Sequence, residues 1–120
     1  MSLIFNIHSG VINACDSSTG LVVWARSFNG HPVYSVLMLK DGDGCLVLVD
    51  YSSSTVPICR NLFRVGIDGS IIWTAGLLPF GDSYASIRFD NDSVIANTWG
   101  GWVVSVNVAD GGVTQIKFTQ

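Results

Sequence analysis

The residues best suited to catalysis in this sequence are two histidines and several groups of serines. His8 and His31 have no acidic residue at a metal-ligand spacing beside them. A nucleophilic serine needs a base held next to it, and serine runs such as residues 52–54 lie in turn-like segments without a GxSxG motif. A hydrolase would require a serine or cysteine within hydrogen-bond reach of a histidine. We therefore expect no enzyme activity and assign no catalytic residue.

The cysteines and aspartates form no recognisable metal site. Cys15, Cys45 and Cys59 are odd in number and show no CxxC spacing, so we expect reduced core thiols rather than disulfides or zinc ligands. Residues 41–44 (DGDG) begin like a calcium loop, but an EF-hand needs a bidentate acid at its twelfth position, where Ser52 stands. We interpret this segment as a hairpin turn, and we expect no metal and no cofactor.

The segment WGGW at residues 99–102 is the most informative aromatic feature. If its two glycines form a two-residue turn, Trp99 and Trp102 face each other across a hairpin and stabilise it. Alternatively, the two indoles project from the turn as a contact surface for a partner protein or for a sugar ring. In that interpretation Asp82 and Tyr84 lie near them and complete a ligand or partner site. Both interpretations stay open at this point.

The composition favours strands over helices. Val, Ile, Ser and Gly are abundant, and all nine acidic residues are aspartate. Because Asp and Gly favour turns whereas Val and Ile favour pleated strands, we expect an almost wholly β protein. A length of 120 residues with 48% hydrophobic content is sufficient for a single domain with its own core.

The charge content limits the kinds of partner that we expect. Charged residues make up 12% of the chain, about half of the roughly 25% usual in soluble domains, which favours a homo-oligomer, with a dimer as the first expectation. The net charge is −3 and the six basic residues are scattered, so nucleic acid is not an expected partner. No apolar run approaches the ~20 residues that cross a bilayer, and the N-terminus lacks a signal-peptide pattern. We expect no membrane association and a cytoplasmic location.

Turn residues divide the chain into short strands. Asp68 and Gly69 separate two apolar segments, as the tight turn of a hairpin does. Beyond them, clusters of Asn, Asp and Gly separate four more strand-like segments, which predicts a four-stranded antiparallel meander. The continuous apolar run CLVLV is typical of a strand covered on both faces. Blade-like units of one domain are predicted over residues 3–28, 33–77 and 83–119.

An internal repeat connects these units. Three segments share a strand, an Asp/Gly turn and a second strand with a large apolar residue, namely Trp24, Trp73 or Ile116. Their spacing lies in or near the ~40–50 residue period of four-stranded propeller blades. The residues predicted to anchor the repeat are Asp16, Gly20, Trp24, Asp68, Gly69 and Trp73.

The repeat carries a family resemblance. The segment ACDSSTGLVVW, residues 14–24, resembles the AxDxxTGxxxW repeat of the PQQ-like β-propellers, in which the Trp docks between neighbouring blades. The segment DGSIIW, residues 68–73, is similar to a shortened copy. The resemblance implies a structural repeat rather than an activity, because fold does not carry function. The chain from Asn61 also resembles small uncharacterised bacterial proteins with an NLxxxxxDGxIIW segment followed by DSY.

Three such blades cannot close a ring, since propellers typically use four to eight. We therefore expect a partial propeller that oligomerisation completes, with edge strands shared in a homodimer. The expected function is a non-enzymatic protein-interaction module with a partner that the sequence does not identify. The alternative is a small-ligand protein, for example one that binds carbohydrate, using its surface tryptophans.

Overall fold

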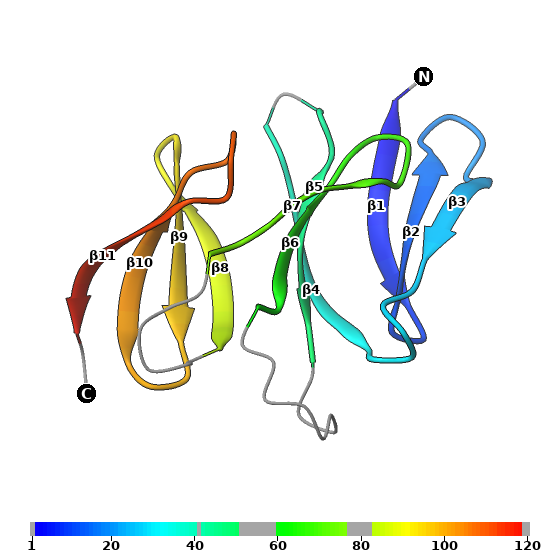
Figure 1. Ribbon diagram of the computed structural model, residues 1–120. Coiled ribbons are helices and arrows are strands. Elements are labelled where there is room, and N and C mark those ends of the chain that lie inside the picture. Colours follow the sequence, from blue (N-terminus) through cyan, green and yellow to red (C-terminus); the bar gives the residue numbers. More distant parts are fainter. Residues whose placement is uncertain (1, 41, 51–59, 77–82, 119–120) are drawn as a thin grey trace.

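The structure is a computed structural model that describes residues 2–40, 42–50, 60–76 and 83–118. Within these ranges the chain forms eleven strands and no helix. The strands build three separate antiparallel sheets (Figure 1), which confirms the all-β prediction. The described ranges accordingly contain no helix suited to crossing a membrane.

Each sheet is a meander in which consecutive strands are neighbours. The first sheet contains β1 (Leu3–His8), β2 (Val11–Asp16) and β3 (Val22–Arg26). The second contains β4 (Val33–Met38), β5 (Cys45–Val49), β6 (Leu62–Val65) and β7 (Ile71–Thr74). The third contains β8 (Tyr84–Asp90), β9 (Ser93–Thr98), β10 (Trp102–Val106) and β11 (Val113–Phe118).

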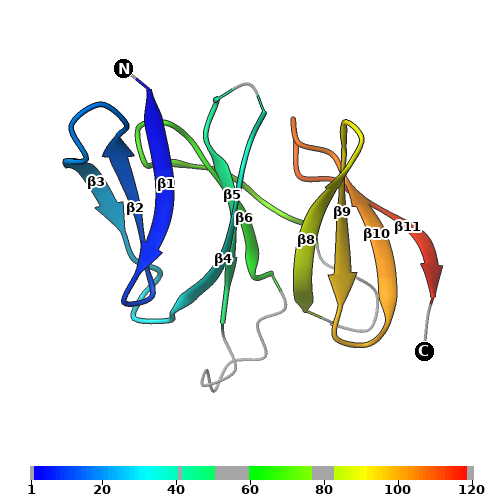
Figure 2. The ribbon, with the colours of Figure 1, turned by 180° about the vertical axis from the view of Figure 1, so that it is seen from behind.

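The three sheets stand side by side like the blades of an open propeller (Figures 1 and 2). Strand β1 contacts β4, and β4 contacts β8, so these strands form the inner edge of the arrangement. Strands β3, β7 and β11 lie at the opposite, outer edges of their sheets. Of the residues that the sequence predicts as repeat anchors, Trp24 and Trp73 lie on the outer strands β3 and β7, and the other four lie in or next to the turns that precede these strands.

Within the described residues, the first sheet has three strands and no counterpart to the inner strand of the other two. Trp24 pairs with Ala14 next to a register shift in β2, and Trp73 pairs with Arg64 next to the same kind of shift in β6. Strands β1, β2 and β3 therefore correspond to β5, β6 and β7. Strand β4 has no counterpart among the described residues of the first sheet, and β1 takes the inner edge instead.

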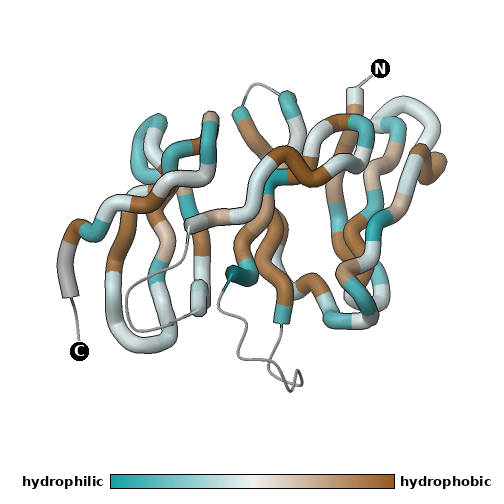
Figure 3. The backbone as a smooth tube through the Cα atoms, in the orientation of Figure 1, coloured by the Kyte–Doolittle hydropathy of each residue, from teal (hydrophilic) through white to brown (hydrophobic). Residues whose placement is uncertain are grey.

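Two apolar cores fill the spaces between the sheets. One lies between the first and second sheets and includes Phe5, Ile12, Val47 and Phe63. The other lies between the second and third sheets and is formed by Leu39, Leu46, Leu48, Leu62, Trp73, Ala75, Tyr84, Val94, Ala96, Val104 and Val106. All five residues of β5 are buried, so the prediction that CLVLV is covered on both faces is confirmed. Figure 3 shows hydrophobic residues along the strands and hydrophilic ones at several turns.

One buried polar side chain connects the second and third sheets. Asn61 is 4% exposed, and its Nδ2 donates to the carbonyl oxygens of Val49 at 3.1 Å and Tyr84 at 2.9 Å. Its Oδ1 accepts a hydrogen bond from the Tyr84 amide at 2.9 Å. The Tyr34 hydroxyl on β4 also donates to the Tyr84 carbonyl oxygen, at 3.0 Å. The side chains of Asn61 and Tyr34 together hold the first residue of β8 against the second sheet.

Replacing Asn61 with Ala removes all three hydrogen bonds and takes a partner from the Val49 carbonyl oxygen and from the Tyr84 amide. The Tyr84 carbonyl oxygen keeps the Tyr34 hydroxyl as a donor. We expect Asn61→Ala to lower the free energy of unfolding by about 2–4 kcal/mol, since each unsatisfied buried group costs about 1–3 kcal/mol. Urea denaturation measures this difference. Asn6→Ala, at an exposed position of β1, serves as the control with little effect, and equal losses for the two variants would contradict the assignment.

Candidate functional site

Trp24 on β3 reaches from the first sheet to the second. Its Nε1–H donates a hydrogen bond to the carbonyl oxygen of Ile67 at 2.7 Å, in the turn between β6 and β7. The indole covers Gly69, where an added Cβ atom would lie 3.1 Å from Cδ2 of Trp24. Arg26 donates from Nε to the Gly69 carbonyl oxygen. Two donors from one outer strand therefore hold the turn of the next sheet.

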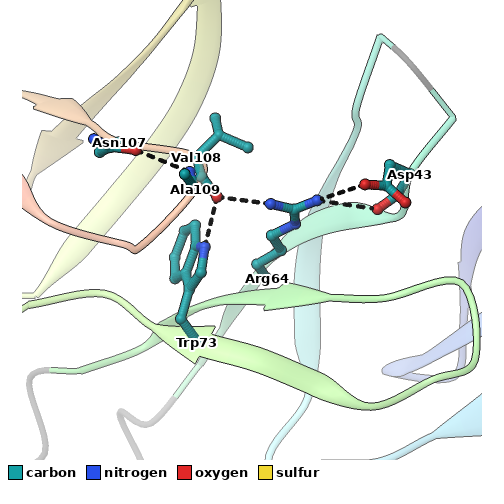
Figure 4. A network of polar contacts seen from close by, with 6 residues as sticks. All are labelled: Asp43, Arg64, Trp73, Asn107, Val108 and Ala109. Atoms are coloured by element: carbon teal, nitrogen blue, oxygen red, sulfur yellow. Dashed lines mark hydrogen bonds and ion pairs between the residues drawn. The ribbon is translucent and has the colours of Figure 1, made fainter.

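Trp73 on β7 repeats this contact one sheet further along. Its Nε1–H donates to the carbonyl oxygen of Val108 at 2.7 Å (Figure 4), and its indole covers Gly111, where a Cβ atom would lie 2.6 Å from Cε3. Arg64 donates to the same carbonyl from Nη1 at 2.9 Å. Its Nη2 pairs with the carboxylate of Asp43 at 3.1 Å. One turn carbonyl thus accepts both an indole and a guanidinium.

The three turns before the outer strands share one backbone design. In the first, the Gly20 amide donates to the Asp16 carbonyl at 2.7 Å and the Asp16 amide donates to the Leu21 carbonyl at 2.9 Å. The third turn has the same two bonds at 2.7 and 2.8 Å, and the second is one residue shorter. Equivalent positions are Asp16, Gly66 and Asn107 at the start, Ser17, Ile67 and Val108 at the carbonyl, and Gly20, Gly69 and Gly111 at the glycine.

The third outer strand departs from the predicted repeat. In the first two sheets the Trp pairs with Ala14 or Arg64, and the equivalent position in β10 is Ser105. Thr114 lies opposite Ser105. The register shift between β10 and β11 comes two residue pairs further from the turn than the shift between β2 and β3. Ile116 is 53% exposed and does not occupy the tryptophan position. The prediction that Ile116 replaces the Trp is therefore wrong.

The WGGW turn has three residues rather than two. Since Val103 pairs with Asn97, Thr98 stands opposite Trp102, and the Thr98 hydroxyl accepts a hydrogen bond from the Trp102 amide at 3.0 Å. Trp99 lies inside the loop and is 72% exposed, whereas Trp102 is half-buried against the core between the second and third sheets. The predicted pair of facing indoles is wrong, and Trp99 alone projects.

Tyr84 is a core residue rather than a contact residue. It is 0% exposed, and its hydroxyl donates to the Gly76 carbonyl oxygen at 2.7 Å. Burial raises the pKa of the Tyr84 hydroxyl to about 12. Asp82 lies outside the described residues. Trp99, Trp102 and Tyr84 therefore do not converge on a ligand site.

Cavities lined by described residues lie where neighbouring sheets meet, and two of them concern the contacts above. The larger, of about 390 Å³, is lined by Trp24, Ala25, Arg26, Ser27, Asp68 and Gly69. The smaller, of about 240 Å³, is lined by Leu39, Lys40, Phe89, Asp92 and Val108. Neither includes the WGGW turn. Both cavities therefore lie between neighbouring sheets.

The two histidines and the calcium-like segment lie in different parts of the structure. His8 is exposed at the end of β1, and His31 donates its amide proton to the Phe28 carbonyl oxygen at 3.0 Å in a turn. Asp43 pairs with Arg64 across the second sheet, while Asp41 and Ser52 lie outside the described residues. Across residues 2–40, 42–50, 60–76 and 83–118, no group of three or more metal-ligating side chains occurs.

The described cysteines are free thiols. Cys45 is buried in the core between the first and second sheets, and burial raises its pKa to about 12, so this thiol is protonated near neutral pH. Cys15 is half-buried on the outward face of the first sheet. Cys59 lies outside the described residues.

The sequence patterns did not reveal the two arginines and the glycine that complete the contacts between neighbouring sheets. Arg26 and Arg64 looked like members of a scattered set of basic residues, yet each donates to a turn carbonyl of the next sheet. Gly111 looked like an ordinary turn glycine. An available signal was the spacing of Arg26 from Trp24, since residues two apart on a strand share one face.

Comparison with known proteins identifies the fold and no function. No protein-family model matches the chain, and no curated protein matches it. A solved structure with a similar fold is a protein of unknown function from Bacteroides caccae, with a TM-score of 0.60 and 19% sequence identity. The match covers 93% of this chain and 38% of that one. This chain therefore spans well under half the length of that structural relative.

Two aspartates reinforce the turns electrostatically. The Ser18 hydroxyl and amide donate to Asp16 at 2.7 and 2.9 Å, and the Ser70 hydroxyl and amide donate to Asp68 at 2.6 and 3.0 Å. These hydrogen bonds, the hydroxyl first, lower the pKa of each carboxyl below 3.8. A depressed carboxyl pKa stabilises the fold at higher pH, and this contribution is lost as the pH falls below 3.8.

Ser70→Ala removes the largest cause of the depressed pKa of Asp68. We expect the pKa of Asp68 to rise toward 3.8 while that of Asp16, whose partner Ser18 is unchanged, stays where it is. Carboxyl carbon NMR during an acid titration reads both groups in one sample. Equal shifts at Asp16 and Asp68 would show that the serine acts through global stability and not through its hydrogen bond.

Gly111 and Gly20 form a matched pair for testing the indole contact. Both have positive φ, 78° and 75°, so replacing either with Ala costs about 1–2 kcal/mol for the left-handed conformation. Only at Gly111 does the new methyl group meet an indole, at 2.6 Å. We expect Gly111→Ala to lose a further 1–3 kcal/mol or so from overpacking, measured by urea denaturation. Equal losses at both sites would mean that Trp73 does not press on this turn.

Proposed function

We propose that this chain is a non-enzymatic interaction module that dimerises by pairing β1 of one copy with β1 of another. The proposal rests on the missing inner strand of the first sheet. In the second and third sheets β4 and β8 pair with β5 and β9, whereas β1 pairs only with β2 among the described residues. A strand added beside β1 would give the first sheet the four strands of the other two.

The backbone of β1 is suited to this pairing. It is six residues long, and alternate residues of an antiparallel pair direct their N–H and C=O groups toward the free edge. Unpaired edges of this kind associate with other strands unless they are blunted by Pro, Lys or a bulge. The β1 segment LIFNIH contains neither Pro nor Lys, and its pairing with β2 has no register shift. Antiparallel pairing of two identical edges produces a twofold dimer.

The outward face of β1 supports a partner at the Leu3 end. Ile4 is 46% exposed, whereas the equivalent residue of β5, Cys45, is 0% exposed because a neighbouring sheet covers it. A cross-strand neighbour from a second copy would cover part of Ile4, and full burial of such a side chain is worth about 1.5–3 kcal/mol. The low charged fraction of 12% supports the same conclusion.

We place this module in the cytoplasm, in keeping with the free thiols of Cys15 and Cys45 and the rarity of disulfides in that compartment. The carbohydrate alternative has less support, because Tyr84 is buried and Trp102 half-buried instead of facing a pocket beside Trp99.

Sedimentation equilibrium over a range of concentrations tests the dimer. We expect wild-type protein to approach twice the chain mass of 12.9 kDa. We expect Ile4→Lys to weaken association about tenfold or more, equivalent to about 1.4 kcal/mol, because a lysine on the pairing strand places a charge between the copies. Ile72→Lys is the control, since Ile72 is 48% exposed on the outer strand β7. A wild-type protein that stays monomeric, or equal effects of the two variants, would refute the β1 dimer.

A further inference from the structure

The first turn has the geometry of an indole-binding site without an indole. At the second and third turns, an indole lies against the left-handed glycine, with Cβ distances of 3.1 Å at Gly69 and 2.6 Å at Gly111. A Cβ atom on Gly20 would meet nothing within 4 Å among the described residues. Since the first and third turns have the same two backbone hydrogen bonds, the difference between them lies in what covers them and not in their own shape.

The carbonyl that would accept the indole is also in place. Ile67 and Val108 follow the first residue of their turns and accept the hydrogen bonds of Trp24 and Trp73. Ser17 holds this position in the first turn and is exposed. The Ser17 amide donates a hydrogen bond to the Ser2 carbonyl oxygen at 2.9 Å. The backbone of the turn sets the orientation of the Ser17 carbonyl.

The rim of this turn is apolar. Leu21 is 69% exposed and Val22 is 58% exposed, and Ile4 on the adjoining end of β1 is 46% exposed. The corresponding residue to Leu21 in the second turn is Ser70, and Val22 corresponds to Ile71, which is 39% exposed. The first turn therefore offers more exposed apolar surface than the second turn, which already contacts Trp24 of β3.

A second copy of this chain does not supply the missing indole by continuing the row of sheets. The outer strand that would come next to the first sheet is β11, and Thr114 lies at its tryptophan position. Trp24 and Trp73 are both engaged within the chain. These observations favour a strand of different sequence as the occupant.

We propose that the turn at residues 16–21 binds a tryptophan-bearing outer strand of a blade carried by a different polypeptide. The indole lies on Gly20 and its N–H donates to the Ser17 carbonyl oxygen, as Trp24 does to Ile67. A cation two residues after that tryptophan reaches the Gly20 carbonyl oxygen, as Arg26 reaches Gly69. This proposal depends on the chain being an interaction module, but not on the β1 dimer, because the indole contacts Gly20 and the Ser17 carbonyl oxygen, which lie in the turn between β2 and β3 and not on the pairing edge of β1.

The probe is a capped peptide with the sequence of residues 21–27, LVVWARS, which carries both donors of the first junction. We expect its addition to the full ¹⁵N-labelled chain to shift the amide signals of Gly20 and Leu21 in a saturable manner at millimolar peptide. A peptide with Phe in place of Trp lacks the indole N–H and should bind about fivefold more weakly, the size of one hydrogen bond.

Gly20→Asn is the matched variant of the chain. Asn tolerates positive φ better than other side chains, so the turn is kept while the new side chain occupies the surface that the indole needs. We expect at least about tenfold weaker peptide binding, with the remaining amide spectrum unchanged. Absence of shifts at Gly20 at millimolar peptide, or equal binding to the Asn variant, would overturn the proposal. Because these measurements report on peptide and not on chain mass, a monomeric chain that binds the peptide would refute the dimer alone.

Discussion

The hydrogen bond from an indole N–H to a turn carbonyl is the constraint on which the arrangement of the sheets depends. In the part of the chain that the structure describes, no strand pairs with a strand of another sheet. Apolar packing alone is non-directional and would let neighbouring sheets slide. Trp24 and Trp73 each add a directional bond of 2.7 Å together with close contact to a glycine. Those two contacts, assisted by the hydrogen bonds of Arg26, Arg64 and Asn61 to the next sheet, set the spacing and the offset of successive sheets.

The contact places demands on the turn that receives it. The receiving glycine must be left-handed and without a side chain, because a Cβ atom at Gly111 would lie 2.6 Å from the indole. The carbonyl three or two residues earlier must be held outward, and a carboxylate or amide at the turn helps by binding a nearby amide. Asp68 does so toward Ser70, and Asn107 toward Ala109. The second turn, although one residue shorter than the third, therefore presents the same kind of acceptor to the indole, a backbone carbonyl oxygen.

Much of this fold could be predicted from the sequence, because strand alternation and Asp/Gly turns are local signals. The WGGW turn was predicted one residue too short, since the Thr98 hydroxyl takes the Trp102 amide and extends the loop. Tyr84 was misjudged because its hydroxyl partner is a backbone carbonyl, of Gly76, which has no side-chain signature. Trp24 was found from its motif, whereas its acceptor lies 43 residues away and is again a carbonyl. Backbone acceptors are invisible to residue patterns.

The outward face of the first sheet limits how another polypeptide can cover it. Cys45, Val47 and Val49 of β5 are all 0% exposed under the first sheet, and their counterparts on β1 are Ile4, Asn6 and His8. Apolar character thus ends after Ile4, and burying the polar residues beyond it is unfavourable unless the partner supplies hydrogen bonds. A partner gains most at the end where Ile4 adjoins the turn of Leu21, which is 69% exposed. Contact at that end engages the turn and leaves the polar end of β1 in water.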